Sequence, residues 1–246
     1  MKLSDFKALT FDCYGTLIDW ETGIWNAFRP LMSAGQLNIE REEAFSLFAR
    51  FETEQEIETP SLRYSSLLAV VHARMAKSWG VAAFADLHDR FGGSVPDWPA
   101  FPDSTAALGY LKRHFKLVIL SNVDRTSFAT SNKKLGVTFD AVYTAEDIGS
   151  YKPDPRNFAY LIDHVESDLG IRKSEILHTA QSLHHDHVPA ERAGLVRAWI
   201  DRRFGKEGSG AIADVSKPPK VDFHFKSLNE FADAHRKERK ALILND

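Results

Sequence analysis

The chain has 246 residues, of which 43% are apolar and 26% charged, and this composition excludes disordered and collagen-like proteins. Thirty-one Lys and Arg against 34 Asp and Glu leave a formal charge of −3, so we expect no general attraction to nucleic acid or to an anionic membrane. Cys13 is the only cysteine, which excludes an intramolecular disulfide and favours the reducing cytoplasm. No apolar stretch approaches the roughly 18 residues that span a bilayer, and the first residues lack a signal-peptide pattern. We therefore expect a cytoplasmic protein.

Five short apolar runs predict buried strands. They are residues 7–11, 117–120, 141–144, 176–179 and 196–200. Helical patterns lie between most of them, as in residues 105–114 and 157–165. This alternation predicts an α/β fold with a parallel sheet covered by helices.

One long interval separates the first two predicted strands. Residues 19–98 show no strand pattern, and their apolar spacing predicts helices at 24–32, 42–58, 65–79 and 84–91. We interpret this interval as an inserted helical domain, and residues 1–18 and 99–246 as the α/β core. The segment 205–220 (GKEGSGAIADVSKPPK) predicts a mobile surface loop.

Polar residues follow several of the predicted strands, and ligands of open parallel sheets bind outside the carboxyl ends of the strands. Asp12 follows the first strand beside a Gly turn whose N–H groups can face an anion, a position that suits a nucleophile. Ser121 and Asn122 follow the second strand, and Lys152, within SYKPDP, can reach back to keep Asp12 ionised. Each residue alone is equally typical of turn or surface chemistry; only their combination indicates a site.

The segment HTAQSLHHDHVPAERAGL follows the fourth predicted strand. Its Asp186 can serve as a second carboxylate that polarises a water. His184, His185 and His187 flank it, but side chains so close in sequence point in different directions and do not converge on one ion. We expect locally hydrogen-bonded imidazoles there and no metal.

In order and spacing, FDCYGTLID, LSN, YKPDP and HTAQSLHHDHVPAERAGL resemble the four motifs of the haloacid dehalogenase (HAD) superfamily. The resemblance extends over nearly the whole chain. It implies a Rossmann-like parallel-sheet core with an inserted α-helical cap domain. A homodimer is expected only through this resemblance.

Two departures from the superfamily pattern bear on the reaction. Most members are magnesium phosphatases with a second Asp two positions after the nucleophile and an acidic metal ligand in the fourth motif. Tyr14 and Gln181 stand at those positions here, so a proton donor and a charged ligand for Mg²⁺ are missing. We expect a hydrolase without a metal or other cofactor. A magnesium phosphatase and a non-catalytic binding module are the alternatives.

A tyrosine within D-x-Y-G-T-L is shared with the type II (S)-2-haloacid dehalogenases, which need no metal. That resemblance implies that Asp12 displaces halide from C2 of a small 2-substituted carboxylic acid and that a water polarised by Asp186 hydrolyses the resulting ester. The same resemblance implies that Lys152 and Thr16 hold Asp12. The residues that we expect near the substrate are Tyr14, Ser121, Asn122, Gln181 and, from the insertion, Arg50.

The azetidine-2-carboxylate hydrolase branch resembles this chain more closely, in FDCYGTLIDWETGI, SYKP and HTA-SL-HDH. There the same Asp would open a strained cyclic amino acid. In LFARFETEQEIETP, Arg50, Glu54 and Glu58 share one helix face, and Glu52 and Glu56 lie on another. Two interpretations stay open: a solvated, ion-paired surface, or Arg50 binding the substrate carboxylate while a nearby glutamate receives a cationic amine.

Overall fold

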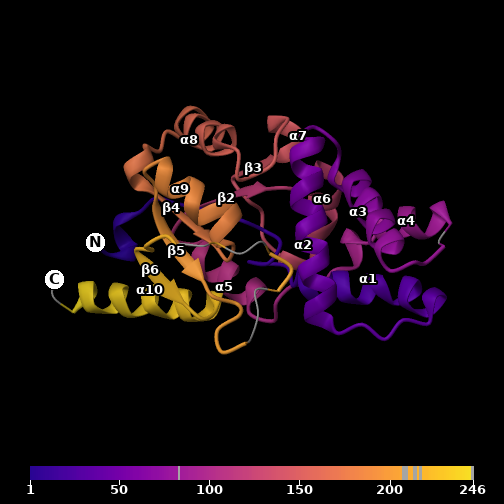
Figure 1. Cartoon of the computed structure of the whole chain (residues 1–246). Helices are drawn as coiled ribbons and strands as arrows, with labels where there is room; N and C mark the ends of the chain where they lie inside the picture. Colours follow the sequence, from indigo (N-terminus) through magenta and orange to yellow (C-terminus); the bar gives the residue numbers. More distant parts are fainter. Residues whose placement is uncertain (83, 207–209, 213–214, 216–217, 245–246) are drawn as a thin grey trace.

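A six-stranded parallel sheet organises the larger part of the molecule (Figure 1). The computed structural model describes residues 1–82, 84–206, 210–212, 215 and 218–244. The strand order is β3-β2-β1-β4-β5-β6, and each neighbouring pair is parallel. The strands are β1 (Ala8–Phe11), β2 (Lys116–Ser121), β3 (Ala141–Thr144), β4 (Ile176–Ala180), β5 (Val196–Ile200) and β6 (Phe223–Phe225). The predicted α/β fold is confirmed, and the first five strands lie within one residue of their predicted bounds.

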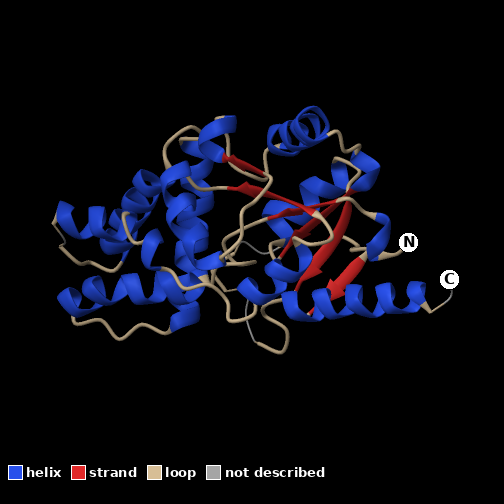
Figure 2. Ribbon diagram, turned by 180° about the vertical axis from the view of Figure 1, so that it is seen from behind, coloured by secondary structure: helices blue, strands red, loops and turns tan. Residues whose placement is uncertain are grey.

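Apolar side chains cover both faces of the sheet, as expected for parallel strands buried between helices. Leu9 and Phe11 of β1 belong to one hydrophobic cluster, and Ala8 belongs to another on the opposite face. The helices around the sheet are α5 (Ser104–Leu111), α6 (Arg125–Leu135), α7 (Ala145–Ile148), α8 (Pro155–Leu169), α9 (Val188–Arg192) and α10 (Leu228–Ile243). α5 and α10 pack on the first cluster, and α8 and α9 on the second. Helices therefore lie on both sides of the sheet (Figure 2).

Four helices form a group at one end of the sheet, with α2 between the strands and the other three (Figure 1). They are α1 (Trp20–Gly35), α2 (Arg41–Glu58), α3 (Tyr64–Ser78) and α4 (Ala85–Gly92), which matches the four predicted helical segments. Phe28 of α1 stacks on Phe91 of α4, with ring centroids 4.9 Å apart. Both rings belong to the same hydrophobic cluster as Leu9 and Phe11. One apolar core therefore joins these helices to the sheet.

The strand register brings the candidate residues to one edge of the sheet. Phe11 pairs with Ile119 of β2 and with Thr179 of β4, so these three strands end nearly level. Asp12 and Gln181 directly follow β1 and β4, and Ser121 is the last residue of β2. Short helical turns at η1 (Leu3–Asp5), η2 (Val95–Asp97), η3 (Lys173–Glu175) and η4 (Leu183–His187) complete the described elements.

Two regions differ from the sequence-based expectation. β6 was not predicted, because its three residues FHF are only half buried and too few to show a period. The predicted loop 205–220 has residues 207–209, 213–214 and 216–217 outside the described residues. Of its described part, Gly205, Lys206, Pro218 and Lys220 are exposed as predicted, whereas Gly210 and Ala211 are buried. No helix in the described ranges is long and apolar enough to cross a membrane.

Candidate active site

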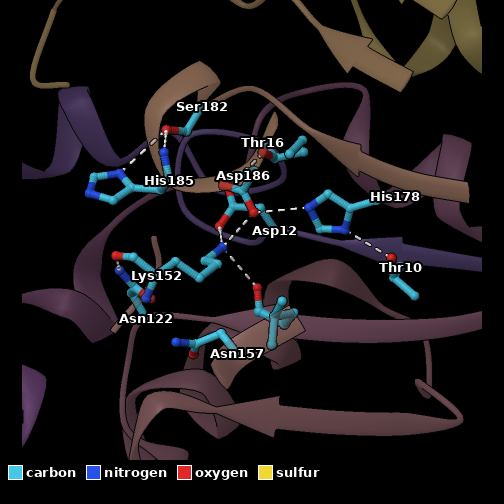
Figure 3. A network of polar contacts seen from close by, with 12 residues as sticks. Thr10, Asp12, Thr16, Asn122, Lys152, Asn157, His178, Ser182, His185 and Asp186 are labelled. Carbon is cyan, nitrogen blue, oxygen red and sulfur yellow. Dashed lines mark hydrogen bonds and ion pairs between the residues drawn. The ribbon is translucent and has the colours of Figure 1, made fainter. Parts of the chain in front are cut away.

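Asp12 lies at the carboxyl end of β1 with a separate partner for each carboxylate oxygen (Figure 3). Lys152 Nζ donates to Oδ1 at 2.9 Å, and Thr16 Oγ1 donates to Oδ2 at 2.7 Å. The turn after Asp12 brings Thr16 back because Gly15 has a φ of +96°, a conformation that other residues rarely adopt. A Cβ at Gly15 would also lie 3.0 Å from Trp20 Nε1. The carboxylate is therefore fixed in one orientation.

Lys152 is a buried cation whose three ammonium protons are all used. Nζ donates to Asp12 Oδ1, to the Leu120 carbonyl at 3.1 Å and to Asp186 Oδ1 at 2.8 Å. Asn122 holds the lysine backbone, since its Oδ1 accepts from the Lys152 N–H and its Nδ2 donates to the Lys152 carbonyl. Burial alone would lower the pKa of Lys152, but the attraction of Asp12 and Asp186 outweighs it and raises the pKa.

Asp186 comes from η4 and offers one free oxygen to the site. Its Oδ1 accepts from Lys152 and from His178 Nε2 at 3.0 Å, whereas its buried Oδ2 has no hydrogen-bond partner among the described residues. Burial works to raise the pKa of Asp186, but Lys152 and the His178 hydrogen bond hold it below the usual range. Burial raises the pKa of Asp12 despite Lys152. Asp186 is thus the carboxylate that stays ionised most readily.

His178 is a site residue that the sequence-based reasoning missed. It is fully buried on β4, and Thr10 Oγ1 of the neighbouring β1 lies 2.9 Å from its Nδ1. The two residues are partners in the strand register. A histidine inside a buried strand, eight residues before Asp186, was the available signal, because buried imidazoles need polar partners.

A small pocket with a volume of about 40 Å³ opens between the strand ends and α2. Ser121 Oγ is buried there without a hydrogen-bond partner among the described residues. Tyr14 also reaches the pocket, although its hydroxyl donates to Ser131 Oγ at 2.8 Å. The lining residues are Asp12, Tyr14, Trp20, Glu52, Glu56, Tyr64, Ser121, Asn122, Val123, Lys152, Ser182, His185, Asp186 and Ile212.

Two glutamates of α2 form the opposite wall of the pocket, and neither was singled out as a site residue from the sequence. Glu52 Oε1 accepts from the Tyr64 hydroxyl at 2.6 Å. Glu56 Oε1 accepts from Asn122 Nδ2 at 3.0 Å, and Glu56 Oε2 lies 3.4 Å from His185 Nε2. Burial raises the pKa of each glutamate to about 8.

The signal for these glutamates lay in the buried face of α2. Phe48 is fully buried on that face. Glu52 and Glu56 lie on the same face, four and eight residues further along the helix. The apolar face of α2 therefore becomes a carboxyl face where it reaches the strand ends.

Arg50 lies on a different face of α2 and does not reach the pocket. Its side chain is exposed, with the guanidinium 4.8 Å from the centroid of Phe51. Glu54 pairs with Arg74 of α3, and Glu58 lies 3.9 Å from the same arginine. The ion-paired surface predicted as one interpretation is confirmed for this face. The placement of Arg50 at the substrate was wrong, because two residues along a helix turn a side chain through about 200°.

Gln181 is also not brought to the pocket by its side chain. Its backbone N–H donates to Thr16 Oγ1 at 2.9 Å, so it supports the residue that holds Asp12. The side chain lines a separate small cavity, together with Arg202 and Arg203. Asn122 lines the pocket, but its amide is engaged by Lys152 and Glu56.

The three clustered histidines diverge, as predicted. His185 faces the pocket, His184 lines a neighbouring groove, and His187 Nε2 donates to the Ala180 carbonyl at 2.9 Å. Burial lowers the pKa of His184 and of His187 to about 4.

The donors around Asp12 do not fit a divalent cation. The Lys152 ammonium lies between Asp12 and Asp186, 2.9 and 2.8 Å from their oxygens, and supplies the positive charge that pairs with both carboxylates. Over the described ranges no three or more His, Cys, Asp or Glu side chains are grouped to hold a metal. Mg²⁺ requires more free anionic oxygens than this arrangement leaves.

Comparison with known proteins agrees with this geometry. A family model of haloacid dehalogenase-like hydrolases matches residues 6–179. The (S)-2-haloacid dehalogenase 1 of Pseudomonas sp. (strain CBS-3) is 25% identical over 185 residues, which cover 71% of this chain and 75% of that protein. The crystal structure of a defluorinating L-2-haloacid dehalogenase shares the fold with a TM-score of 0.75 at 21% identity, over 96% of this chain and 98% of the other. An L-2-haloacid dehalogenase from Xanthobacter autotrophicus with chloropropionic acid covalently bound gives a TM-score of 0.74 at 20% identity, over 94% and 98%. The chain is a hydrolase and belongs to the haloacid dehalogenase-like hydrolase family.

Proposed function

We propose that this hydrolase acts on a small 2-substituted carboxylic acid through an ester on Asp12, in the manner of an (S)-2-haloacid dehalogenase. The observation that carries the proposal is the fixed Asp12 carboxylate, which faces the pocket while Lys152 and Thr16 hold its two oxygens. Such a carboxylate can attack a carbon atom in line with a leaving group, because its hydrogen bonds define its direction. The names of the relatives support the same reaction class.

In the first step, an Asp12 oxygen forms a bond to C2 of the substrate and the leaving group departs with the bonding electrons. Asp12 becomes an uncharged ester. The Lys152 ammonium then has Asp186 as its one remaining carboxylate partner among the residues that line the pocket. Ser121 Oγ is buried without a hydrogen-bond partner among the described residues and can donate to the substrate carboxylate.

In the second step, a water attacks the carbonyl carbon of the Asp12 ester, and the bond between that carbon and the product oxygen breaks. One water proton passes to the product oxygen and the other is released to solvent, so that the Asp12 carboxylate is regenerated. Asp186 Oδ2 is the free acceptor for that water, since Oδ1 is held by Lys152 and His178. The low pKa of Asp186 keeps it anionic, so its role is to orient and polarise the water. The product is a 2-hydroxy acid with inverted configuration at C2.

We also propose that residues 19–98 act as a cap over a core of residues 1–18 and 99–246. The position of α2 between the strand ends and the other three helices supports this division (Figure 1). The pocket takes its residues from both parts. A substrate enclosed between them would be shielded from bulk water, which strengthens the electrostatic interactions in the site.

Ring opening of azetidine-2-carboxylate is a second candidate, favoured by the two glutamates of α2. Of the described residues that line the pocket, Lys152 is the only Lys or Arg, and its protons are already used. A haloacid brings only a negative charge to this pocket. A cyclic amino acid also brings a positive charge, which Glu52 and Glu56 can stabilise.

One experiment tests the ester directly. A single turnover in ¹⁸O-labelled water with excess enzyme places the label in the Asp12 side chain if the ester forms there. Label that goes straight into the product would mean direct attack by water. A screen of (S)-2-chloropropionate, azetidine-2-carboxylate and p-nitrophenyl phosphate, each with and without EDTA, identifies the leaving group. Turnover of the phosphate ester that EDTA abolishes and Mg²⁺ restores would replace this proposal with a phosphatase.

A further inference from the structure

Among the described residues that line the pocket, no cation is free to pair with an anionic substrate. An ammonium group has three protons to donate, and the three of Lys152 go to Asp12, Asp186 and the Leu120 carbonyl. His185 is buried, and its pKa lies below the usual range because burial disfavours the charged form. The carboxyl groups of the pocket therefore outnumber its available positive charges.

The two glutamates of the α2 wall differ in what they can still bind. Both oxygens of Glu56 have polar neighbours, Asn122 Nδ2 at 3.0 Å and His185 Nε2 at 3.4 Å. Glu52 accepts one hydrogen bond, from the Tyr64 hydroxyl to Oε1, and no described residue hydrogen-bonds to Oε2. Glu52 is only 3% exposed and lines the pocket. A buried carboxyl oxygen in that position requires a partner to be stable as an anion.

We propose that Glu52 is the specificity-determining residue for substrates that carry an ammonium group, which it receives at Oε2, and that its carboxyl releases a proton as that group binds. This inference rests on the proposed function. It adds the residue that binds the ammonium group and the release of a proton on binding. One positive charge enters the pocket and one proton leaves to bulk water. The ammonium group and the ionised Glu52 then neutralise each other, while the substrate carboxylate adds one negative charge to the pocket.

The groups that face Glu52 come from three elements, and in the empty pocket those that disfavour its anion outweigh those that favour it. Glu56 lies on α2, Tyr64 on α3 and His185 in η4, while Asp12 and Lys152 form the opposite wall of the pocket. Burial and the nearby Glu56 disfavour the anion of Glu52 and raise its pKa to about 8, against the smaller effects of Tyr64 and His185. A bound ammonium group reverses this balance because it supplies the missing counter-charge.

A zwitterionic substrate and an anionic one distinguish this role of Glu52 from a purely structural role. In wild-type protein, kcat/KM for azetidine-2-carboxylate should rise as the pH increases toward about 8, because deprotonated Glu52 binds the ammonium group. With (S)-2-chloropropionate, kcat/KM should fall over the same range, because an ionised Glu52 repels the anion. Glu52→Gln should lower kcat/KM for the cyclic amino acid by at least about tenfold at pH 8 and abolish the fall of kcat/KM with pH for the haloacid. Glutamine keeps an acceptor for Tyr64, so the variant conserves the local packing.

Glu54→Gln is the matched control. It lies two residues away on the same helix, with its side chain 44% exposed and paired with Arg74. It should leave both substrates within about twofold, since an exposed ion pair contributes little. A parallel loss with both substrates in Glu52→Gln would overturn the inference and leave the Asp12 ester untouched.

A binding measurement decides the inference independently of turnover. L-proline has the same charges as azetidine-2-carboxylate but an unstrained ring. Calorimetric titration with L-proline at pH 7, in phosphate and in Tris, should show release of close to one proton on binding to wild-type protein and none with Glu52→Gln. Equal observed enthalpies in the two buffers, before any correction for buffer ionisation, would mean that no proton is released and would overturn the inference, as would no binding at millimolar concentration. Failure of the ¹⁸O-label to reach Asp12 would instead overturn the proposed function.

Discussion

The buried carboxyl groups on the two walls of the pocket differ in whether they are hydrogen-bonded to a cation. At the strand ends, Asp12 and Asp186 share the Lys152 ammonium, and each receives one further hydrogen bond, from Thr16 and His178. On the α2 wall, no Lys or Arg among the described lining residues hydrogen-bonds to Glu52 or Glu56, and the attraction of Lys152 for Glu56 is smaller than the effect of burial. Burial raises the pKa of these two glutamates to about 8.

This difference separates chemistry from selection. A nucleophile and a water-polarising base must be anionic before the substrate arrives, so their counter-charge is built into the protein. A group that recognises a charged substrate gains most when its counter-charge comes from the substrate itself. The strand-end wall is therefore suited to any leaving group, and the α2 wall is the part that can distinguish one substrate from another.

The largest expected effect is at the nucleophile. Replacing Asp12 by Asn should lower kcat by about four orders of magnitude or more, because the attacking oxygen is removed while the shape is kept. Single-turnover assays by mass spectrometry should detect no ester on the variant. Residual turnover at a tenth of the wild-type rate would show that another carboxylate is the nucleophile.

The counter-charge should affect stability as well as rate. Lys152→Met removes the cation shared by Asp12 and Asp186 and leaves two buried carboxylates without it. We expect the free energy of unfolding at pH 7 to fall by about 3–5 kcal/mol, and activity to be lost. Urea denaturation measures the first effect. The loss of stability should shrink below about pH 4, where protonation of both carboxyls removes the unpaired charge. A loss that stays constant between pH 4 and pH 7 would show that packing, not charge, is responsible.

On the α2 wall, removal of a charged group should raise the free energy of unfolding at high pH instead of lowering it. The pKa of Glu52 and of Glu56 is about 8 in the folded chain, against an ordinary value of 4.5. Between these two pH values the unfolded chain ionises first, so each group makes folding less favourable as the pH rises, by up to about 1.4 kcal/mol per pH unit. The contribution is fully present below about pH 4.5 and lost above about pH 8. Glu52→Gln should therefore be more stable than wild type at pH 8 and nearly equal at pH 5.

Much of this site was predictable because it follows from the backbone. The buried runs of β1, β2 and β4 are apolar enough to be recognised, and their parallel register places Asp12, Ser121 and the segment before Asp186 at one edge. Lys152 was predictable because its motif position and its charge both point to Asp12. His178 was not, since a strand histidine acquires a role only once the neighbouring strand and Asp186 are placed beside it.

The α2 wall could not be predicted with the same means, because it depends on how a helix is rotated about its axis. Apolar and charged residues alternate along α2 so closely that several faces are equally plausible from the sequence alone. The structure turns the face with Phe48, Glu52 and Glu56 inward and leaves Arg50 outside. Packing of Phe48 against Trp20 and Phe28, with ring centroids 6.1 Å apart in each pair, fixes that rotation.

The smallest expected effect tests the same rotation from its outer side. Arg50 is exposed over Phe51 and is not among the described residues that line the pocket. Replacing Arg50 by Ala should change kcat/KM for either substrate by less than about twofold. Stability should fall by no more than about 1 kcal/mol, the usual contribution of an exposed cation over an aromatic ring. Steady-state kinetics with (S)-2-chloropropionate is the decisive measurement. If Arg50 bound the substrate carboxylate, its removal would raise KM by at least about tenfold. Such an increase would mean that α2 rotates when substrate binds, and would bring Arg50 to the wall that Glu52 and Glu56 occupy here.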